Sequence, residues 1–336
     1  MLAVLRLSVP DGAGYGPPRR RGMTKRGSDI LRVIAGLFAA LGFTACASSA
    51  PKPAPDGEVP VPTVELLGPG TAPFRVLRFT PKAGQRELMA LTTTMGVGMS
   101  LGPGKTPPMT NMPPIAMTCE VETTEVRPDG TFRTRFAILA AQVEPDPTFP
   151  IDMAVALASA VEPLVGLQGT ARMTDRGITL EAQVAVPADA DPATRQLLDG
   201  IKASLTQLGV PLPIEAVGVG ARWRVNSELD NAVRVRQTMM VELIELDATH
   251  ATLRMSIAQS AARQRIKVAG LPATTVVDLT SLTGDGDGDV ALDLGRLVPD
   301  SSHLEMRTLT KSLISGDGEE LPMAMTMTVT VDIAPR

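Results

Sequence analysis

Short runs in which apolar and polar residues alternate are the feature that most constrains this chain. The clearest run lies near the C-terminus, where methionine and valine alternate with threonine and alanine from Met323 to Val331. Similar runs lie at 116–126, 132–138 and 252–257. A period of two places the apolar side chains on one face of a strand. The pattern therefore predicts a mainly β domain of antiparallel sheets, in one large or two similar half-units.

Glycine, proline, aspartate and asparagine separate these runs, as the turns between antiparallel strands require. Two segments have helical spacing instead. One is a helical connection at 190–209, which begins with an aspartate–proline pair and ends at a glycine. The other is 152–161. We expect these one or two helices between strand-rich halves at 74–188 and 216–334.

The first 46 residues have the three zones of a secretory signal, namely a basic stretch, an apolar stretch and an exit of small residues. The apolar stretch, 33–42, is about half the roughly 20 residues that a membrane-spanning helix needs. Translation from Met1 or from Met23 would each give a complete signal. The sequence therefore predicts export, with residues 1–46 removed.

The exit of this signal, Phe43, Thr44, Ala45 and Cys46, resembles the lipobox of bacterial lipoproteins. Phe43 departs from the leucine usual at that position. The resemblance implies that the Cys46 thiol receives a diacylglyceryl group before cleavage and that the protein is a membrane-bound lipoprotein. By the same resemblance, Ala47 after the cysteine favours the outer membrane over the inner one. Ordinary cleavage after Ala47 is the alternative, and it would leave a freely periplasmic protein.

The mature chain is acidic and starts with a proline-rich segment. Removing residues 1–46 takes seven basic and two acidic side chains from totals of 32 and 36, which leaves a net charge of −9. An acidic surface repels phosphate backbones, so nucleic acid is not an expected partner. Residues 47–73 are rich in proline and small residues, and we expect a disordered linker there. It would connect the anchor to a β-rich envelope domain at 74–334.

With Cys46 assigned to lipid, Cys119 is the remaining cysteine, so the sequence predicts no intramolecular disulfide. Cys119 alternates with glutamates in an apolar strand pattern. We interpret it as a small buried side chain, not a reactive thiol.

Few residues suit catalysis. The chain has two histidines: His250 follows a turn-forming sequence, and His303 is predicted in a loop. A triad of Ser302, His303 and a remote aspartate is the weak catalytic alternative. Residues 104–106 resemble the end of a phosphate-binding loop, but Met99 stands where its first glycine belongs and two prolines follow. The sequence favours a non-catalytic protein without a cofactor.

Alternating aspartates at Asp285, Asp287 and Asp289 are weak candidates for calcium ligands. An EF-hand needs a glutamate at position 296, which is Arg296. The other interpretation, which the sequence favours, is a solvated hairpin tip in which the intervening glycines have positive φ.

Methionines favour two interpretations. Thioethers bind Cu(I), yet Met323, Met325 and Met327 have the strand spacing of core residues. Trp223 has the position of an inward-facing residue. We expect both sets to be packed inside, where thioethers also adapt to apolar ligands.

Part of the chain resembles a family of uncharacterised bacterial secreted lipoproteins defined as a domain of unknown function. The resemblance covers roughly 74–334. It includes a hairpin at Gly166–Gly177 and rests on these packing and turn residues: Phe79, Pro81, Ala83, Gly84, Leu212, Pro213, Val217, Gly218, Gly220, Ala221 and Trp223. It implies an exported location and no particular activity.

The sequence as a whole predicts a non-catalytic envelope lipoprotein that acts by binding or scaffolding. Its partners would be the membrane, through lipid on Cys46, and either another envelope protein or an apolar ligand. In the alternative, the protein carries or senses a lipid or other apolar ligand in a β cavity lined by methionine, leucine and valine.

Overall fold

The computed structural model describes residues 60–102, 109–185, 209–230, 233–266, 275–316 and 319–336. The predicted signal with Cys46, and residues 190–208 of the predicted helical connection at 190–209, lie outside these residues. The elements, in chain order, are β1 (Thr63–Gly68), β2 (Thr71–Val76), β3 (Arg86–Leu101), β4 (Met109–Val126), β5 (Phe132–Val143), α2 (Ile151–Val161), the 3-10 helix η1 (Glu162–Leu164), β6 (Gln168–Met173), β7 (Thr179–Val184), β8 (Ala216–Val219), β9 (Arg222–Asp230), β10 (Arg234–Leu246), β11 (His250–Ala261), β12 (Gln264–Ile266), β13 (Val276–Asp293), β14 (Ser301–Gly316) and β15 (Glu319–Pro335).

Thirteen of these strands form one antiparallel sheet, which confirms the predicted fold class. The order is β1-β9-β10-β11-β13-β14-β15-β3-β4-β5-β6-β7, with β12 also paired to β13, while β2 and β8 form a second, two-stranded sheet. The last strand, β15, pairs with β14 on one side and with β3 on the other. The two expected halves are therefore joined into a single sheet, because the C-terminal strand β15 of the second half pairs with β3 of the first.

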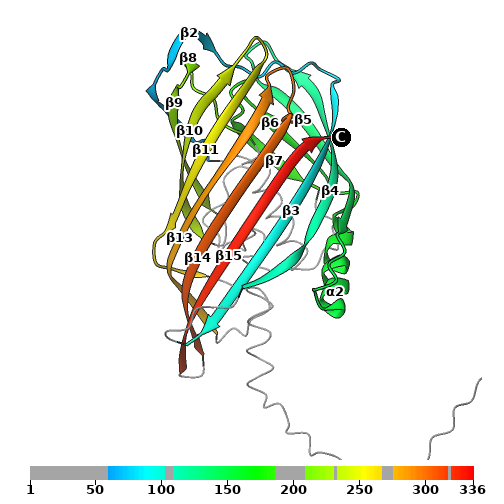
Figure 1. Cartoon of the computed structure of the whole chain (residues 1–336), viewed down its shortest axis with the longest axis vertical. Coiled ribbons are helices and arrows are strands. Elements are labelled where there is room, and N and C mark those ends of the chain that lie inside the picture. Colours follow the sequence, from blue (N-terminus) through cyan, green and yellow to red (C-terminus); the bar gives the residue numbers. More distant parts are fainter. Residues whose placement is uncertain (1–59, 103–108, 186–208, 231–232, 267–274, 317–318) are drawn as a thin grey trace, which may run out of the picture.

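The large sheet is long and strongly curved (Figure 1). Near the end drawn at the top, loops bridge strands that are distant in the sheet order. The backbone N–H of Phe79 donates to Asp175 O at 2.7 Å, and the next N–H, of Thr80, donates to Leu294 O at 2.7 Å. Leu212 N–H donates to Arg176 O at 2.9 Å. These bonds connect the β6–β7 turn and the segment after β13 to the segments that flank the small sheet.

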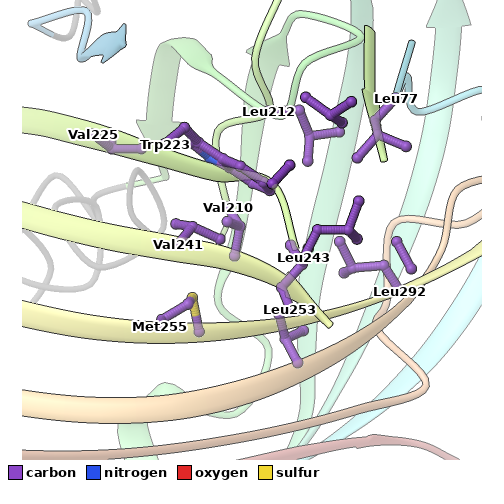
Figure 2. Close-up of a cluster of buried hydrophobic side chains, with 14 of the residues drawn as sticks. Leu77, Val210, Leu212, Trp223, Val225, Val241, Leu243, Leu253, Met255 and Leu292 are labelled. Atoms are coloured by element: carbon purple, nitrogen blue, oxygen red, sulfur yellow. The ribbon is translucent and has the colours of Figure 1, made fainter. Parts of the chain in front are cut away.

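A large hydrophobic core lies at this bridged end, around Trp223 (Figure 2). Trp223 is fully buried, as predicted, and its indole Nε1–H donates to Pro211 O at 2.9 Å. Phe132 of β5 belongs to the same cluster as Met255 of β11, so both ends of the sheet share one core. The residues of the family resemblance that pack here are Phe79, Leu212, Val217, Ala221 and Trp223.

The run of alternating glycine and aspartate is a strand, which corrects the predicted hairpin tip. It lies inside β13, which continues from Val276 to Asp293. A Cβ on Gly286 would lie 2.4 Å from Met306 Sδ and 2.5 Å from Glu305 O. Gly286 and Gly288 are thus placed where neighbouring atoms leave no space for a side chain, not where a turn requires positive φ. Sequence alone does not show this crowding.

Three further expectations are confirmed or corrected. The helix expected at 152–161 is α2, but it lies between β5 and β6, inside the first half and not between the halves. Part of the expected linker, 47–73, is ordered as β1 and the start of β2, because Val64 and Leu66 pair with β9 and pack on its core. His303 lies in strand β14, not in a loop.

Among the residues that the structure describes, no helix combines the length and the apolar character needed to cross a membrane.

Candidate functional site

The most unusual feature of the large sheet is a methionine-rich stretch of its inward face, the face opposite Asp285, Asp287 and Asp289. Inward side chains of β15 alternate as predicted, and Met323, Met325 and Met327 are all buried. The strand register places Met325 directly opposite Met99 of β3. We call this stretch the methionine face, and its members are Met95, Val97, Met99, Met112, Met323, Met325, Met327 and Val329.

Two buried hydroxyls border the methionine face. In β14, Thr310 lies opposite Met325, and Ser312 lies opposite Met323. Both side chains are almost completely buried, and neither hydroxyl has a hydrogen-bond partner among the described residues. A buried hydroxyl without a partner costs about 1–3 kcal/mol. A buried polar group without a partner in the protein needs an explanation, and contact with a bound ligand is one explanation for this pair beside the methionines.

A polar pair continues the same face across β13. Gln259 Nε2 donates to Gln237 Oε1 at 2.7 Å, and Gln237 is buried. Gln259 lies opposite Gly284, which in turn lies opposite Thr308. The row from Gln237 to Thr308 therefore offers hydrogen-bonding groups next to the thioethers. The combination suits a ligand that is mostly apolar and carries a few polar atoms.

The calcium candidates Asp285, Asp287 and Asp289 lie on the opposite, solvent-facing side of β13. Asp289 forms an ion pair with Arg254 at 3.4 Å, and Asp285 lies opposite Arg307. Within the described part of the chain, no three histidine, cysteine, aspartate or glutamate side chains are grouped so that they could hold a metal ion. In one extended strand these carboxylates project in a row about 6.6 Å apart and do not converge.

The histidines are half-exposed on the surface, on β11 and β14, and β13 lies between these two strands. His250 starts β11, at the predicted hairpin turn, where its N–H donates to Asp247 Oδ1 at 2.8 Å. His303 Nδ1 lies 2.7 Å from Asp332 Oδ1, and this hydrogen bond raises the pKa of the imidazole above its usual value. Ser302 precedes His303 in the same strand, so their side chains point to opposite faces of the sheet. The local geometry does not assemble a triad.

Cys119 is buried, as predicted, in a cluster with Met89 and Ile138. Burial raises the pKa of its thiol to about 11. The thiol therefore stays protonated and poorly nucleophilic at neutral pH.

Thr310 and Ser312 were not predicted from the sequence as site residues. The alternation of β14, with Lys311 on the other face, indicates that they point inward. Only the register with β15 shows that they lie beside methionines. Cys46 and the phosphate-loop-like residues 104–106 lie outside the described residues.

No family model matches the chain, and no curated protein matches it. One solved structure with a likeness is OmpTdeltaL8, a loop L8 deletion mutant of OmpT, an outer membrane protein of Vibrio cholerae. It has 9% sequence identity and a TM-score of 0.18, and the match covers 74% of this chain and 100% of that chain. A second, described as "Asymmetric conductivity of engineered proteins", has 10% identity and a TM-score of 0.19, with the same coverage of 74% and 100%. At TM-scores this low, neither comparison identifies a fold or a function.

Proposed function

We propose that this protein is an exported, non-catalytic envelope lipoprotein, held at the outer membrane by lipid on Cys46, which binds an apolar ligand on its methionine face. The observation that carries the ligand proposal is the position of two buried hydroxyls without described partners, Thr310 and Ser312, beside buried methionines. Thioether side chains are flexible and adapt to apolar molecules of varied shape.

The anchor rests on the lipobox-like exit of the signal, and the resemblance to secreted lipoproteins supports it. In cells given radiolabelled palmitate, the wild-type protein should incorporate label, and Cys46→Ser should not, because the serine hydroxyl does not replace the acylated thiol. The measurement is label in the immunoprecipitated protein. Wild-type protein without label, with an N-terminus at Ser48, would contradict the anchor and support simple secretion.

The ligand proposal predicts opposite effects on occupancy and stability. Thr310→Val combined with Ser312→Ala should weaken binding at least about tenfold and reduce the copurifying apolar ligand accordingly, since two hydrogen bonds of roughly 0.5–1.5 kcal/mol each are lost. In protein freed of ligand, the same change should leave the melting temperature unchanged or raise it, because the buried hydroxyls then have no partner. Occupancy is measured by native mass spectrometry and by organic extraction of full-length protein purified from membranes.

Thr328→Val is the matched control, because Thr328 lies on the same strand as Met327 but on the opposite face. We expect the control to keep wild-type occupancy. Wild-type protein without any extractable ligand, or equal occupancy in all three proteins, would contradict ligand binding on the methionine face and favour a scaffolding role.

A further inference from the structure

Several large apolar side chains in and next to the small sheet are exposed. Every residue of β2 is exposed, including Phe74 at 52%. Ile214, just before β8, is 64% exposed. We call residues 67–76 and 214–219 the β2–β8 lobe. Its exposed large apolar side chains, five of the fifteen among the described residues, are Leu67, Phe74, Val76, Ile214 and Val219. A cluster of this kind on a folded protein marks an interaction site more often than a scattered residue does.

The lobe is held firmly in this exposed position. Thr71 Oγ1 donates to Val219 O at 3.0 Å, and Gly218 N–H donates to Pro69 O at 2.8 Å. A Cβ on Gly218 would lie 1.8 Å from Thr71 O, so the two strands approach as closely as glycine permits. These contacts fix the backbone of the lobe, so its apolar side chains are exposed in a defined arrangement.

Two arginines hold the lobe in place: Arg75 connects it to the large sheet, and Arg78 connects the segment after β2 to the segment before β8. Arg75 Nη1 donates to Asp247 O at 2.8 Å and also to Ala248 O, in the turn between β10 and β11. Arg78 donates from Nη1 to Pro213 O at 2.9 Å and from Nη2 to Ile214 O at 3.0 Å. Arg78 therefore fixes the backbone at Ile214, whose side chain is exposed. Figure 1 shows β2 and β8 together at one end of the molecule, drawn at the top.

Charge distinguishes the lobe from the other exposed apolar surface, on α2. Segments 60–82 and 209–222, which contain the lobe, have four basic and two acidic residues. Arg78 and Arg222 form ion pairs with Asp175 and Glu242, so Arg75 and Lys82 are the basic residues of these segments that are not paired in this way with a described residue. The segment around α2, 136–171, has no basic residue and four acidic ones: Glu144, Asp146, Asp152 and Glu162. Apolar side chains with arginine and lysine nearby suit the headgroup region of a bilayer, whereas a purely acidic surround does not.

The lobe is also within reach of the proposed anchor. Residues 47–59, between Cys46 and the first described residue, span up to about 45 Å when extended at roughly 3.5 Å per residue. Strand β1, about 20 Å long, then leads through Pro69 and Gly70 directly into β2, so the tether has to extend back by about this length to bring the lobe to the membrane. The lobe is therefore near the start of the domain, and the tether is long enough for it to touch the membrane that holds the lipid.

From these observations we propose that the β2–β8 lobe docks on the lipid bilayer, inserting Phe74, Val76 and Ile214 at the headgroup level. This inference rests on one part of the proposed function, the lipid anchor on Cys46, which would keep the domain at the membrane. Docking would turn one end of the large sheet toward the lipid, the source of an apolar ligand.

The test uses full-length protein from membranes, reconstituted into vesicles of phosphatidylethanolamine and phosphatidylglycerol at 3:1. An environment-sensitive fluorophore is attached at Phe74→Cys, and in separate proteins at Ile214→Cys and at Val155→Cys on α2. The buried Cys119, with a raised pKa, reacts poorly and interferes little. Lipids with a spin label near the headgroup should quench the fluorophores at 74 and 214 at least threefold more than the one at 155, which is the matched control.

Equal quenching at all three sites would overturn the proposal. The proposal would also be overturned if iodide in the aqueous phase, but not the spin-labelled lipid, quenched the fluorophore at 74. A label at 74 that neither quencher reaches would also overturn it and would indicate a protein partner or a second copy. Phe74→Ser with Val76→Ser, checked for an unchanged melting temperature, should reduce quenching at 214 to the level of the control. If the protein carries no acyl group, the labelled variants are mixed with the same vesicles, so failure of the anchor and failure of the lobe are observed separately.

Discussion

Replacing Glu87 with alanine should destabilise the protein by about 3–5 kcal/mol, the cost of breaking a buried charge network. The Glu87 side chain is 4% exposed. Its carboxylate accepts backbone N–H groups from Leu297 and Val298, each at 3.1 Å, and pairs with Arg296 at 3.3 Å. Alanine would leave these donors without an acceptor. Thermal unfolding followed by circular dichroism is the measurement, and we expect a melting temperature lower by about 10 °C.

Two variants test whether the Glu87 effect comes from this network. Glu87→Gln keeps one acceptor oxygen and should lose less, about 1–3 kcal/mol. Glu228→Ala removes a carboxylate that is 60% exposed and lies 3.6 Å from Arg236, so it should lose at most about 1 kcal/mol. If Glu87→Ala melted like Glu228→Ala, the carboxylate would not fasten the loop after β13 to β3.

Replacing Trp223 with alanine should cost about 3–5 kcal/mol, the range for deleting a large aromatic side chain from a core. Trp223 pairs with Leu66 of β1 and Val241 of β10, and it belongs to the cluster that joins both ends of the sheet. Its neighbours in Figure 2 come from several strands, so the space would not close by moving one of them. Denaturant unfolding followed by circular dichroism measures the change.

The control for Trp223 separates volume from hydrogen bonding. Trp223→Phe retains most of the ring but loses the bond from Nε1 to Pro211 O, so it should cost about 1–2 kcal/mol. Leu309→Ala, on the outer face of β14, should cost less than about 1 kcal/mol. Similar losses for Trp223→Ala and Leu309→Ala would show that the shared core is not where the sheet is stabilised.

The two stability predictions concern the end of the molecule that also carries the β2–β8 lobe. Trp223 binds Pro211 O, and Arg78 binds Pro213 O and Ile214 O. The segment 209–214 thus passes from the core to the exposed apolar surface within a few residues. Loss of Trp223 should therefore loosen the lobe as well as the core.

Alternation along the sequence was enough to predict the class of fold and which face of a strand most side chains occupy. Alternation with a period of two fixes which residues share a face, because successive side chains of a strand point to opposite sides. It was sufficient to predict that Met323, Met325, Met327, Cys119 and Trp223 are buried. It was also sufficient for the β10–β11 turn at His250 and, by helical spacing, for α2.

Which strands are neighbours became known from the folded chain alone. A single sequence contains no information on register between distant strands, so it did not place Thr310 beside Met325 or Glu87 beside the loop at 296–298. It also gave the wrong conformation for the run from Gly284 to Asp289. Glycine suits a turn in isolation, but here crowding by Met306 and neighbouring backbone excludes any side chain from an extended strand. The site and the lobe both depend on such long-range contacts, which form only when the strands pair.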